Sequence, residues 1–291
     1  MFKGSFVAII TPFKNGQIDE ETLRKLVNWH IENGTDGIIP CGTTGESATL
    51  SYEEHKRVIK IVVEEVNKRV PVIAGTGSNN TKEAIELTEA ARQDGADAAL
   101  VITPYYNKPT QEGLYQHFKK IAEEVAIPIV MYNVPGRTAV DMLPDTVGRL
   151  SKISNIVGIK DATGSMKVLT EIIENTRGNN FCLLSGDDFV YFPFLSVGGD
   201  GVISVVANIA PKITAELYDA FVNGNLDRAR ELHFAVNELS RAMFLQTNPI
   251  PVKKAAALMG LVEDEIRLPL VSMEGKAVEI LKDVLKKYKL I

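Results

Sequence analysis

Short apolar runs alternate along this chain with amphipathic segments long enough to form helices. Between residues 6 and 224 the alternation repeats eight times, which is typical of βαβ units built around a parallel sheet. The predicted strands are residues 6–11, 37–41, 70–75, 98–103, 128–132, 156–160, 181–185 and 201–204. The fold class predicted from this pattern is therefore α/β.

Eight helix–strand units favour a closed (β/α)8 TIM barrel, because doubly wound open sheets usually have fewer strands. Residues 1–224 are the predicted catalytic barrel. Residues 225–291 carry a purely helical pattern, with helices expected at 226–244, 251–259 and 275–288. No Gly/Ser-rich linker separates the two parts, so we expect this C-terminal helical extension to pack on the barrel.

Composition and charge exclude several classes of function. The 291 residues have a formal net charge of -5 and no basic stripe, so a nucleic acid partner is not expected. No apolar run approaches the roughly 20 residues of a membrane span, and the N-terminus has no secretory pattern. Cys41 and Cys182 have no metal-type spacing and are expected to be reduced and buried, which favours a cytoplasmic protein.

A lysine ends one of the apolar runs. Val157, Gly158 and Ile159 lead directly into Lys160, which places an amine at the carboxyl end of a buried strand. Burial there lowers the pKa of an amine and favours attack on a carbonyl group. Lys160 is therefore a candidate Schiff-base nucleophile, although a lysine reaching from the strand end into solvent has the same local pattern.

Two other strand ends carry groups that suit such an amine. Thr43 and Thr44 lie in a glycine-flanked turn whose N–H and hydroxyl groups can hold a carboxylate, or can simply cap a helix. Tyr132 can transfer protons near an amine, or can serve only as a packing residue. Arg137 follows a Pro-Gly turn and carries a guanidinium that matches a carboxylate.

Cofactors and metals receive no support from the sequence. The segment 75–80 resembles a dinucleotide fingerprint, but Asn80 stands where its third glycine belongs, so no nicotinamide cofactor is expected. The four histidines lie in separate helical segments without metal-type spacing, so no metal is expected. No Gly-x-Ser-x-Gly elbow is present, and a serine hydrolase has no support.

Taken together, these segments resemble the dihydrodipicolinate (4-hydroxy-tetrahydrodipicolinate) synthases, a branch of the pyruvate-dependent class I aldolase family. The resemblance extends over essentially the whole chain. Its most specific motifs are Gly42-Thr43-Thr44-Gly45-Glu46, Thr103-Pro104-Tyr105-Tyr106-Asn107, Tyr132-Asn133-Val134-Pro135-Gly136-Arg137-Thr138, Gly158-Ile159-Lys160 and Asn248-Pro249-Ile250-Pro251-Val252-Lys253. Arg137 distinguishes this branch from the sugar-acid aldolases.

The resemblance implies a function and roles for particular residues. Lys160 is expected to form an imine with pyruvate, whose enamine condenses with L-aspartate 4-semialdehyde on the diaminopimelate route to L-lysine. Tyr132, Thr43 and Tyr106 are expected to form a proton relay. The expected substrate-binding residues are Thr44, Arg137, Gly186 and Ile203.

The resemblance also implies an assembly and a regulator. Tyr106 is expected to reach into a neighbouring subunit of a homotetramer made of two dimers. L-lysine is a possible feedback inhibitor. The residues matching its site are Ser47, Ala48, His55, Asn79, Glu83 and Tyr105. Tyr52 stands where some inhibited members have histidine, so lysine sensitivity can differ in this chain.

Two alternative functions are compatible with the same fold. One is another pyruvate-dependent aldolase or lyase acting on a sugar acid, which Arg137 argues against. The other is a barrel that binds a ligand without catalysis. Because barrels support many chemistries, the fold alone does not choose among these functions.

Overall fold

The computed structural model describes residues 2–291, and its central feature is a cylinder of eight parallel strands. The strands are β1 (Gly4–Ala8), β4 (Gly37–Ile39), β5 (Ile73–Gly75), β6 (Ala98–Ile102), β7 (Ile129–Asn133), β8 (Ile156–Asp161), β9 (Cys182–Ser185) and β10 (Gly201–Ser204). Their order in the sheet is β4-β1-β10-β9-β8-β7-β6-β5, and a parallel bridge between Ile38 and Val72 joins the two edge strands. The predicted TIM barrel is confirmed.

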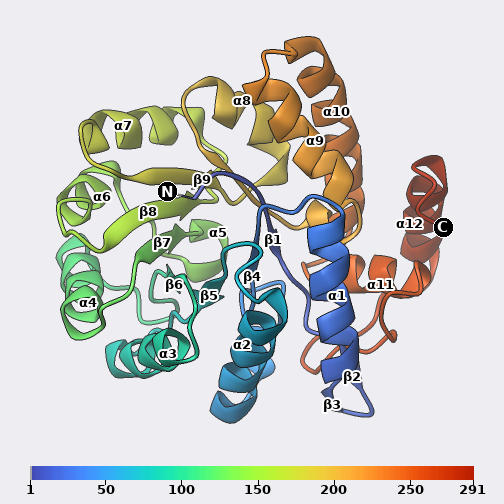
Figure 1. Ribbon diagram of the computed structural model, residues 1–291, viewed down its shortest axis with the longest axis horizontal. Coiled ribbons are helices and arrows are strands. Elements are labelled where there is room, and N and C mark those ends of the chain that lie inside the picture. The colour runs from blue at the N-terminus through green and yellow to red at the C-terminus, as the bar shows by residue number, and fades with distance from the viewer. Residues whose placement is uncertain (1) are drawn as a thin grey trace.

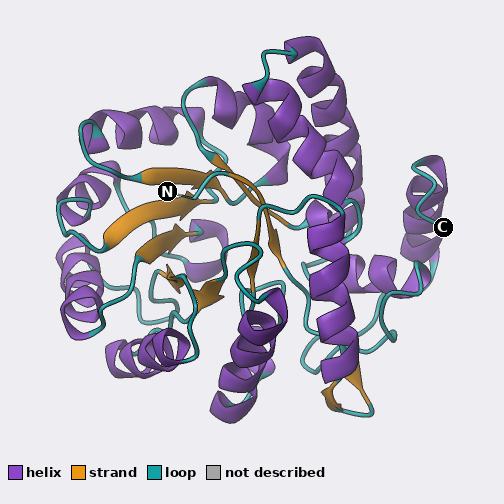
Figure 2. Cartoon of the chain, in the orientation of Figure 1, coloured by secondary structure: helices purple, strands orange, loops and turns teal. Residues whose placement is uncertain are grey.

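A ring of helices surrounds the strands (Figures 1 and 2). The helices that follow successive strands are α1 (Glu20–Glu32), α2 (Tyr52–Val66), α3 (Thr81–Gln93), α4 (Gln111–Glu124), α6 (Pro144–Leu150), α7 (Met166–Thr176), α8 (Tyr191–Ser196) and α9 (Pro211–Val222). Short additions are the hairpin β2 (Phe13–Lys14) and β3 (Gln17–Ile18), the four-residue helix α5 (Pro135–Thr138), and the 3₁₀ turns η1 (Ser47–Thr49), η2 (Asp188–Val190) and η3 (Val206–Asn208).

Local sequence explains where the helices begin. The Asp19 carboxylate accepts a hydrogen bond from the backbone N–H of Thr22 at the start of α1. Ser51 and Glu54 form a reciprocal capping box at the start of α2. Both caps use residue types that favour helix starts.

The boundaries differ from the prediction at several strands. The first strand begins at Gly4 and ends at Ala8, so residues 9–11 belong to the following loop, although they remain buried. Cys41 lies beyond the end of β4 with φ of 56°, although its predicted burial is correct. Apolar loop residues that pack under the helices continue the apolar run of the strand before them. The predicted strands therefore extended too far along the chain.

The barrel interior is filled by side chains from alternate strand positions. This cluster contains Phe6, Ile39, Ile73, Leu100, Val130, Tyr132, Leu184 and Ile203. Gly37 has no side chain because a Cβ atom there would lie 2.1 Å from the ring of Phe6. Two larger apolar clusters lie between the strands and the helices, so the barrel is a packed core rather than a pore.

The C-terminal region contains α10 (Leu226–Met243), α11 (Ile250–Leu258) and α12 (Lys276–Lys287), close to the three predicted helices. Figure 1 shows α11 and α12 on the same side of the barrel as α1. Leu239, Val252 and Leu281 belong to one apolar cluster with Val7 and Leu23, so this region and the barrel share a core. The division at residue 224 stays a prediction.

Candidate active site

Lys160 lies inside the barrel, next to the last residue of β8. Its side chain is buried, and in the sheet it stands opposite Tyr132 of the neighbouring strand β7. The Lys160 Nζ atom lies 4.2 Å from the centroid of the Tyr132 ring. The amine therefore does not reach into bulk solvent.

Burial also changes the protonation of this amine. Desolvation lowers the pKa of Lys160 to about 7, the charge of Asp188 opposes that shift, and the charge of Arg137 adds to it. Near neutral pH a large fraction of the side chain is therefore the free amine, which is the form that attacks a carbonyl carbon.

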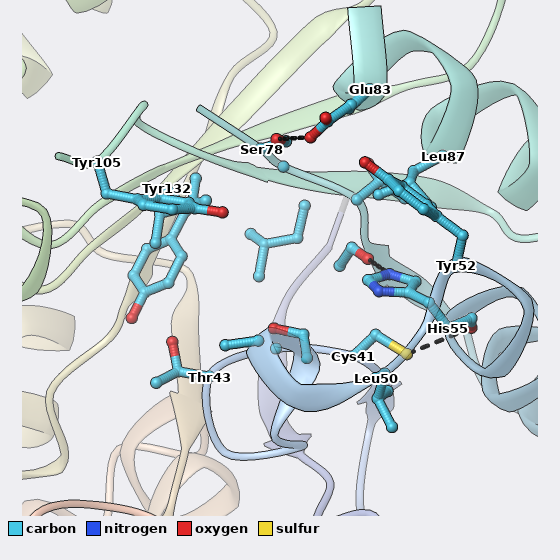
Figure 3. A pocket seen from close by; sticks show the side chains of 18 of the residues that line it. Cys41, Thr43, Leu50, Tyr52, His55, Ser78, Glu83, Leu87, Tyr105 and Tyr132 are labelled. Atoms are coloured by element: carbon cyan, nitrogen blue, oxygen red, sulfur yellow. Dashed lines mark hydrogen bonds between the residues drawn. The ribbon is translucent and has the colours of Figure 1, made fainter. Parts of the chain in front are cut away.

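Tyr132 is a neutral phenol at physiological pH. Burial raises its pKa to about 12, whereas the charge of Arg137 and a hydrogen bond with Thr43 lower this pKa. Figure 3 shows the Tyr132 hydroxyl pointing toward the Thr43 hydroxyl. Because both groups can donate and accept a proton, they can pass one along this contact.

Gly186 leaves the space that the lysine side chain occupies. A Cβ atom at this position would lie 2.9 Å from Lys160 Cε and 3.2 Å from Cγ. Ile203 of β10 belongs to the apolar cluster in the barrel interior that includes Tyr132. Neither residue carries a reactive group, so reasoning from the residues did not find them, and only the family resemblance did.

A cavity of about 460 Å³ opens beside these groups, and Thr43, Tyr132 and Arg137 line it. Lys160, Thr44, Gly186 and Ile203 are not among its lining residues. The structure therefore brings together three of the predicted groups around this space, and the Lys160 amine lies 4.2 Å from the centroid of the Tyr132 ring, one of the lining residues.

Thr44 and Arg137 are both held by Asn248. The Thr44 hydroxyl is buried and accepts a hydrogen bond of 3.0 Å from Asn248 Nδ2. The Arg137 guanidinium donates to the Asn248 backbone oxygen at 3.3 Å. In the sequence, Asn248 stands out only as part of a family motif.

Asp188 is a second residue that the sequence analysis missed. Its carboxylate is buried and accepts hydrogen bonds from the backbone N–H groups of Val205 (2.9 Å) and Val206 (3.1 Å). It lies near enough to Lys160 to raise the pKa of that amine. An aspartate in a short 3₁₀ turn has no pattern that separates it from an ordinary capping residue.

Tyr106 lies on the surface of the chain. Its side chain is 90% exposed, and it does not line the cavity. Its backbone has φ of 72°, which is unusual for a residue with a side chain. The expected role of Tyr106 in the site of a neighbouring subunit stays a prediction.

The residues expected to bind lysine lie mostly around the same cavity. Its lining includes Ser47, Ala48, His55, Glu83 and Tyr105. Figure 3 shows Tyr52, His55 and Glu83 on the side of the cavity opposite to Tyr132 and Thr43.

Several polar groups on this side of the cavity already make hydrogen bonds within the chain. His55 Nε2 lies 2.7 Å from the Gly75 oxygen, and Ser78 donates to Glu83 at 2.8 Å. Burial and a hydrogen bond to Glu83 raise the pKa of Tyr52 to about 12. Asn79 is not in the lining, but its side-chain amide donates to the Tyr105 oxygen at 3.1 Å.

Comparison with known proteins decides the family. The family model described as "Dihydrodipicolinate synthetase family" matches residues 1–288. This chain belongs to that family. The dihydrodipicolinate synthetase family resemblance stated from the sequence motifs, and with it the class I aldolase type of enzyme, is therefore confirmed.

Individual relatives match over their full length. The 4-hydroxy-tetrahydrodipicolinate synthase of Geobacter sp. (strain M21) is 58% identical over 291 residues, which are 100% of both chains. The crystal structure of dihydrodipicolinate synthase from Acinetobacter baumannii complexed with pyruvate is 51% identical, with a TM-score of 0.97 over 100% of each chain. The enzyme from Cyanidioschyzon merolae with lysine bound is 38% identical, with a TM-score of 0.96 over 100% of this chain and 99% of that one.

No helix within residues 2–291 is both long and apolar enough to cross a membrane. In the same residues, no three or more His, Cys, Asp or Glu side chains are grouped so that they could hold a metal ion.

Proposed function

We propose that this chain condenses pyruvate with L-aspartate 4-semialdehyde through an imine on Lys160, giving 4-hydroxy-tetrahydrodipicolinate and one water. The observation that carries the proposal is the buried Lys160 amine, with its pKa lowered to about 7, lying 4.2 Å from the Tyr132 ring centroid. The full-length relatives named for this reaction support the choice of substrates.

The reaction begins with attack of the neutral Lys160 amine on the ketone carbon of pyruvate. Proton transfer through Tyr132 and Thr43 allows the carbinolamine to lose water and become an imine. The pyruvate carboxylate binds the N–H and hydroxyl groups of the Thr43–Thr44 turn. Loss of a methyl proton then gives an enamine.

The enamine carbon attacks the aldehyde of the second substrate, whose carboxylate binds the Arg137 guanidinium. The new C–C bond forms as the aldehyde oxygen takes a proton and becomes the 4-hydroxyl group. The substrate amine then attacks the imine carbon, closes the ring and displaces Lys160 as a free amine. No water is needed for this release, so the single water comes from imine formation.

Borohydride reduction in the presence of pyruvate tests the central step. Peptide mass mapping is expected to find a reduced adduct on Lys160, and Lys160→Met should abolish it. Lys167→Met is the matched control, because that lysine is exposed and pairs with Glu171 at the surface. An adduct on another lysine, or none in the wild-type protein, would falsify the mechanism.

The assignment of the second substrate depends on Arg137. We expect Arg137→Ala to impair use of the semialdehyde far more than imine formation with pyruvate, because the guanidinium binds only the second carboxylate. Arg149→Ala is the control, since Arg149 pairs with Glu112 on the outer helices. Equal loss of both steps would remove this role, and preference for a sugar-acid aldehyde in a substrate panel would favour the alternative aldolase.

We also propose that L-lysine binds the side of the cavity formed by Ser47, Ala48, His55, Glu83 and Tyr105. The Glu83 carboxylate suits an ammonium group, and a related enzyme has been solved with lysine bound. Millimolar L-lysine should inhibit the wild-type protein, and Glu83→Gln should weaken that inhibition. Activity unchanged by lysine would contradict the regulatory site and leave the catalytic proposal intact.

For the quaternary structure and compartment, we propose a cytoplasmic homotetramer made of two dimers. The 90% exposure of Tyr106 supports a partner surface at that loop. Sedimentation analysis of the purified protein measures the oligomeric state directly, and a monomer at working concentrations would contradict the assembly.

A further inference from the structure

Asn248 brings an amide from outside the barrel to the wall of the active site. It lies just before α11 in the C-terminal region and is only 4% exposed. Its side chain contacts Thr44, which is 204 residues away in the sequence. The family motif that contains Asn248 has no place in the reaction described above.

The side-chain amide and the backbone oxygen of Asn248 contact Thr44 and Arg137, the two residues proposed to bind substrate carboxylates. Nδ2 donates to the Thr44 hydroxyl oxygen at 3.0 Å. The backbone oxygen accepts from the Arg137 guanidinium at 3.3 Å. Oδ1 is buried and has no hydrogen-bond partner within residues 2–291.

The direction of the first bond determines what Thr44 can do. A hydroxyl group has one hydrogen and two lone pairs. Since Asn248 Nδ2 donates to the oxygen, one lone pair is occupied and the hydroxyl hydrogen is turned away from Asn248. Thr44 is then a hydrogen-bond donor for an anion in the site.

We infer that Asn248 is a positioning residue that fixes the Thr44 hydroxyl as a donor to the keto-acid carboxylate and holds Arg137 toward the carboxylate of the aldehyde substrate. This inference rests on the proposed function, because it assigns a carboxylate to each of the two contacts. The C-terminal region thereby takes part in substrate binding without touching the reacting atoms.

Two substitutions separate this role from simple packing. Asn248→Ala removes the amide and should raise KM for pyruvate about 5- to 15-fold, the effect of one lost hydrogen bond. Asn248→Asp keeps the size of the side chain, but an ionised carboxylate can only accept hydrogen bonds. It would therefore accept a hydrogen bond from the Thr44 hydroxyl, which could then no longer donate to the substrate. It would also place a negative charge beside the substrate carboxylate. The KM of this variant for pyruvate should exceed that of the alanine variant at least tenfold.

A packing role predicts the opposite order, because aspartate fills the site better than alanine. In both variants kcat should fall less than kcat/KM for pyruvate. KM for the semialdehyde should change less than about threefold in Asn248→Ala, because Arg137 binds the backbone oxygen, which this substitution keeps. Asn225→Ala is the control, since Asn225 caps α10 in the same region and should alter thermal stability without altering KM.

A double-mutant cycle tests the contact itself. Thr44→Val removes the hydroxyl group, so adding Asn248→Ala to it should raise KM for pyruvate by less than twofold. Additive effects, or an alanine variant weaker in pyruvate binding than the aspartate variant, would overturn the inference. Absence of a borohydride-trapped imine in the wild-type protein would instead overturn the proposed function.

Discussion

For single residues, the chemistry depends on the free-energy cost of burying an amine. Lys160 has a pKa of about 7 in the folded chain, because burial disfavours the ammonium form. In the unfolded chain its pKa is near 10.5. The unfolded state therefore binds more protons between these two values, and this residue makes stability rise with pH from about 7 to about 10.5.

Replacing this lysine should stabilise the protein. Lys160→Met removes the cost of burying the amine. The lowering of its pKa from 10.5 to about 7 corresponds to roughly 4 kcal/mol at pH 7, at about 1.36 kcal/mol per pKa unit, so we expect the free energy of unfolding to rise by about that amount. The gain should be largest at pH 7 and below and should shrink toward pH 10.5. Urea denaturation at several pH values measures it, and a gain independent of pH would show that packing is responsible.

Asp188 should set the pH range in which the amine reacts. Its charge raises the pKa of Lys160, so Asp188→Asn is expected to lower that pKa. The rate of imine formation with pyruvate would then reach its plateau at a lower pH than in the wild-type protein. Stopped-flow measurements over the pH range test this, and general damage to the fold would reduce the plateau without moving the midpoint.

At the scale of elements, a buried ion pair joins the loop after β4 to α11. Lys253 Nζ lies 2.5 Å from Glu46 Oε1, and both side chains are almost fully buried. Glu46 also accepts from the backbone N–H of Arg267 at 3.1 Å. The loop that carries Thr43 and Thr44 is therefore anchored to the C-terminal region at several points.

Breaking one side of this pair should cost much more than breaking both. Glu46→Gln leaves the Lys253 charge buried and unpaired, which is expected to lower the free energy of unfolding by about 3 to 5 kcal/mol. Glu46→Gln combined with Lys253→Met should cost less than either single change. Chemical denaturation measures all three, with the exposed pair Lys82–Glu86 as the control, whose disruption should change stability by less than about 0.5 kcal/mol.

For the molecule as a whole, the proposed assembly of subunits would decide whether each site is complete. The Tyr106 side chain is 90% exposed in the isolated chain, although a tyrosine in this loop was expected to serve in the proton relay. A phenol that faces away from its own subunit can act only on a neighbouring one. The proposed function therefore predicts that catalysis and assembly are coupled through this single side chain.

Mixed assemblies test that coupling. Tyr106→Phe and Lys160→Met should each be nearly inactive alone, with the phenylalanine variant losing about 10- to 100-fold in kcat. If Tyr106 acts across the interface, a mixed dimer has one site with both defects and one with neither. Co-assembly should then restore about a quarter of the wild-type activity, for random pairing in a two-fold symmetric dimer. No recovery would place Tyr106 in its own subunit's site or outside the mechanism.

Local patterns in the amino-acid sequence were enough to predict the barrel and to identify most of the candidate reactive groups. Alternating apolar runs and amphipathic segments follow from local periodicity, and parallel strands put their carboxyl ends at one edge, so Lys160, Tyr132, Arg137 and the Thr43–Thr44 turn could be recognised from their positions alone. Motif resemblance added Gly186 and Ile203, which carry no chemical signal of their own.

The distant residues that contact these groups can be identified only in the folded chain. Asn248 meets Thr44 and Arg137, Lys253 meets Glu46, and Asp188 affects Lys160, although none of these partners is marked by local pattern. The lowered pKa of Lys160 likewise arises from its surroundings in the folded chain. Periodicity is a local property of the chain, whereas burial, charge and hydrogen bonding at the site depend on segments that fold together from opposite ends of the sequence.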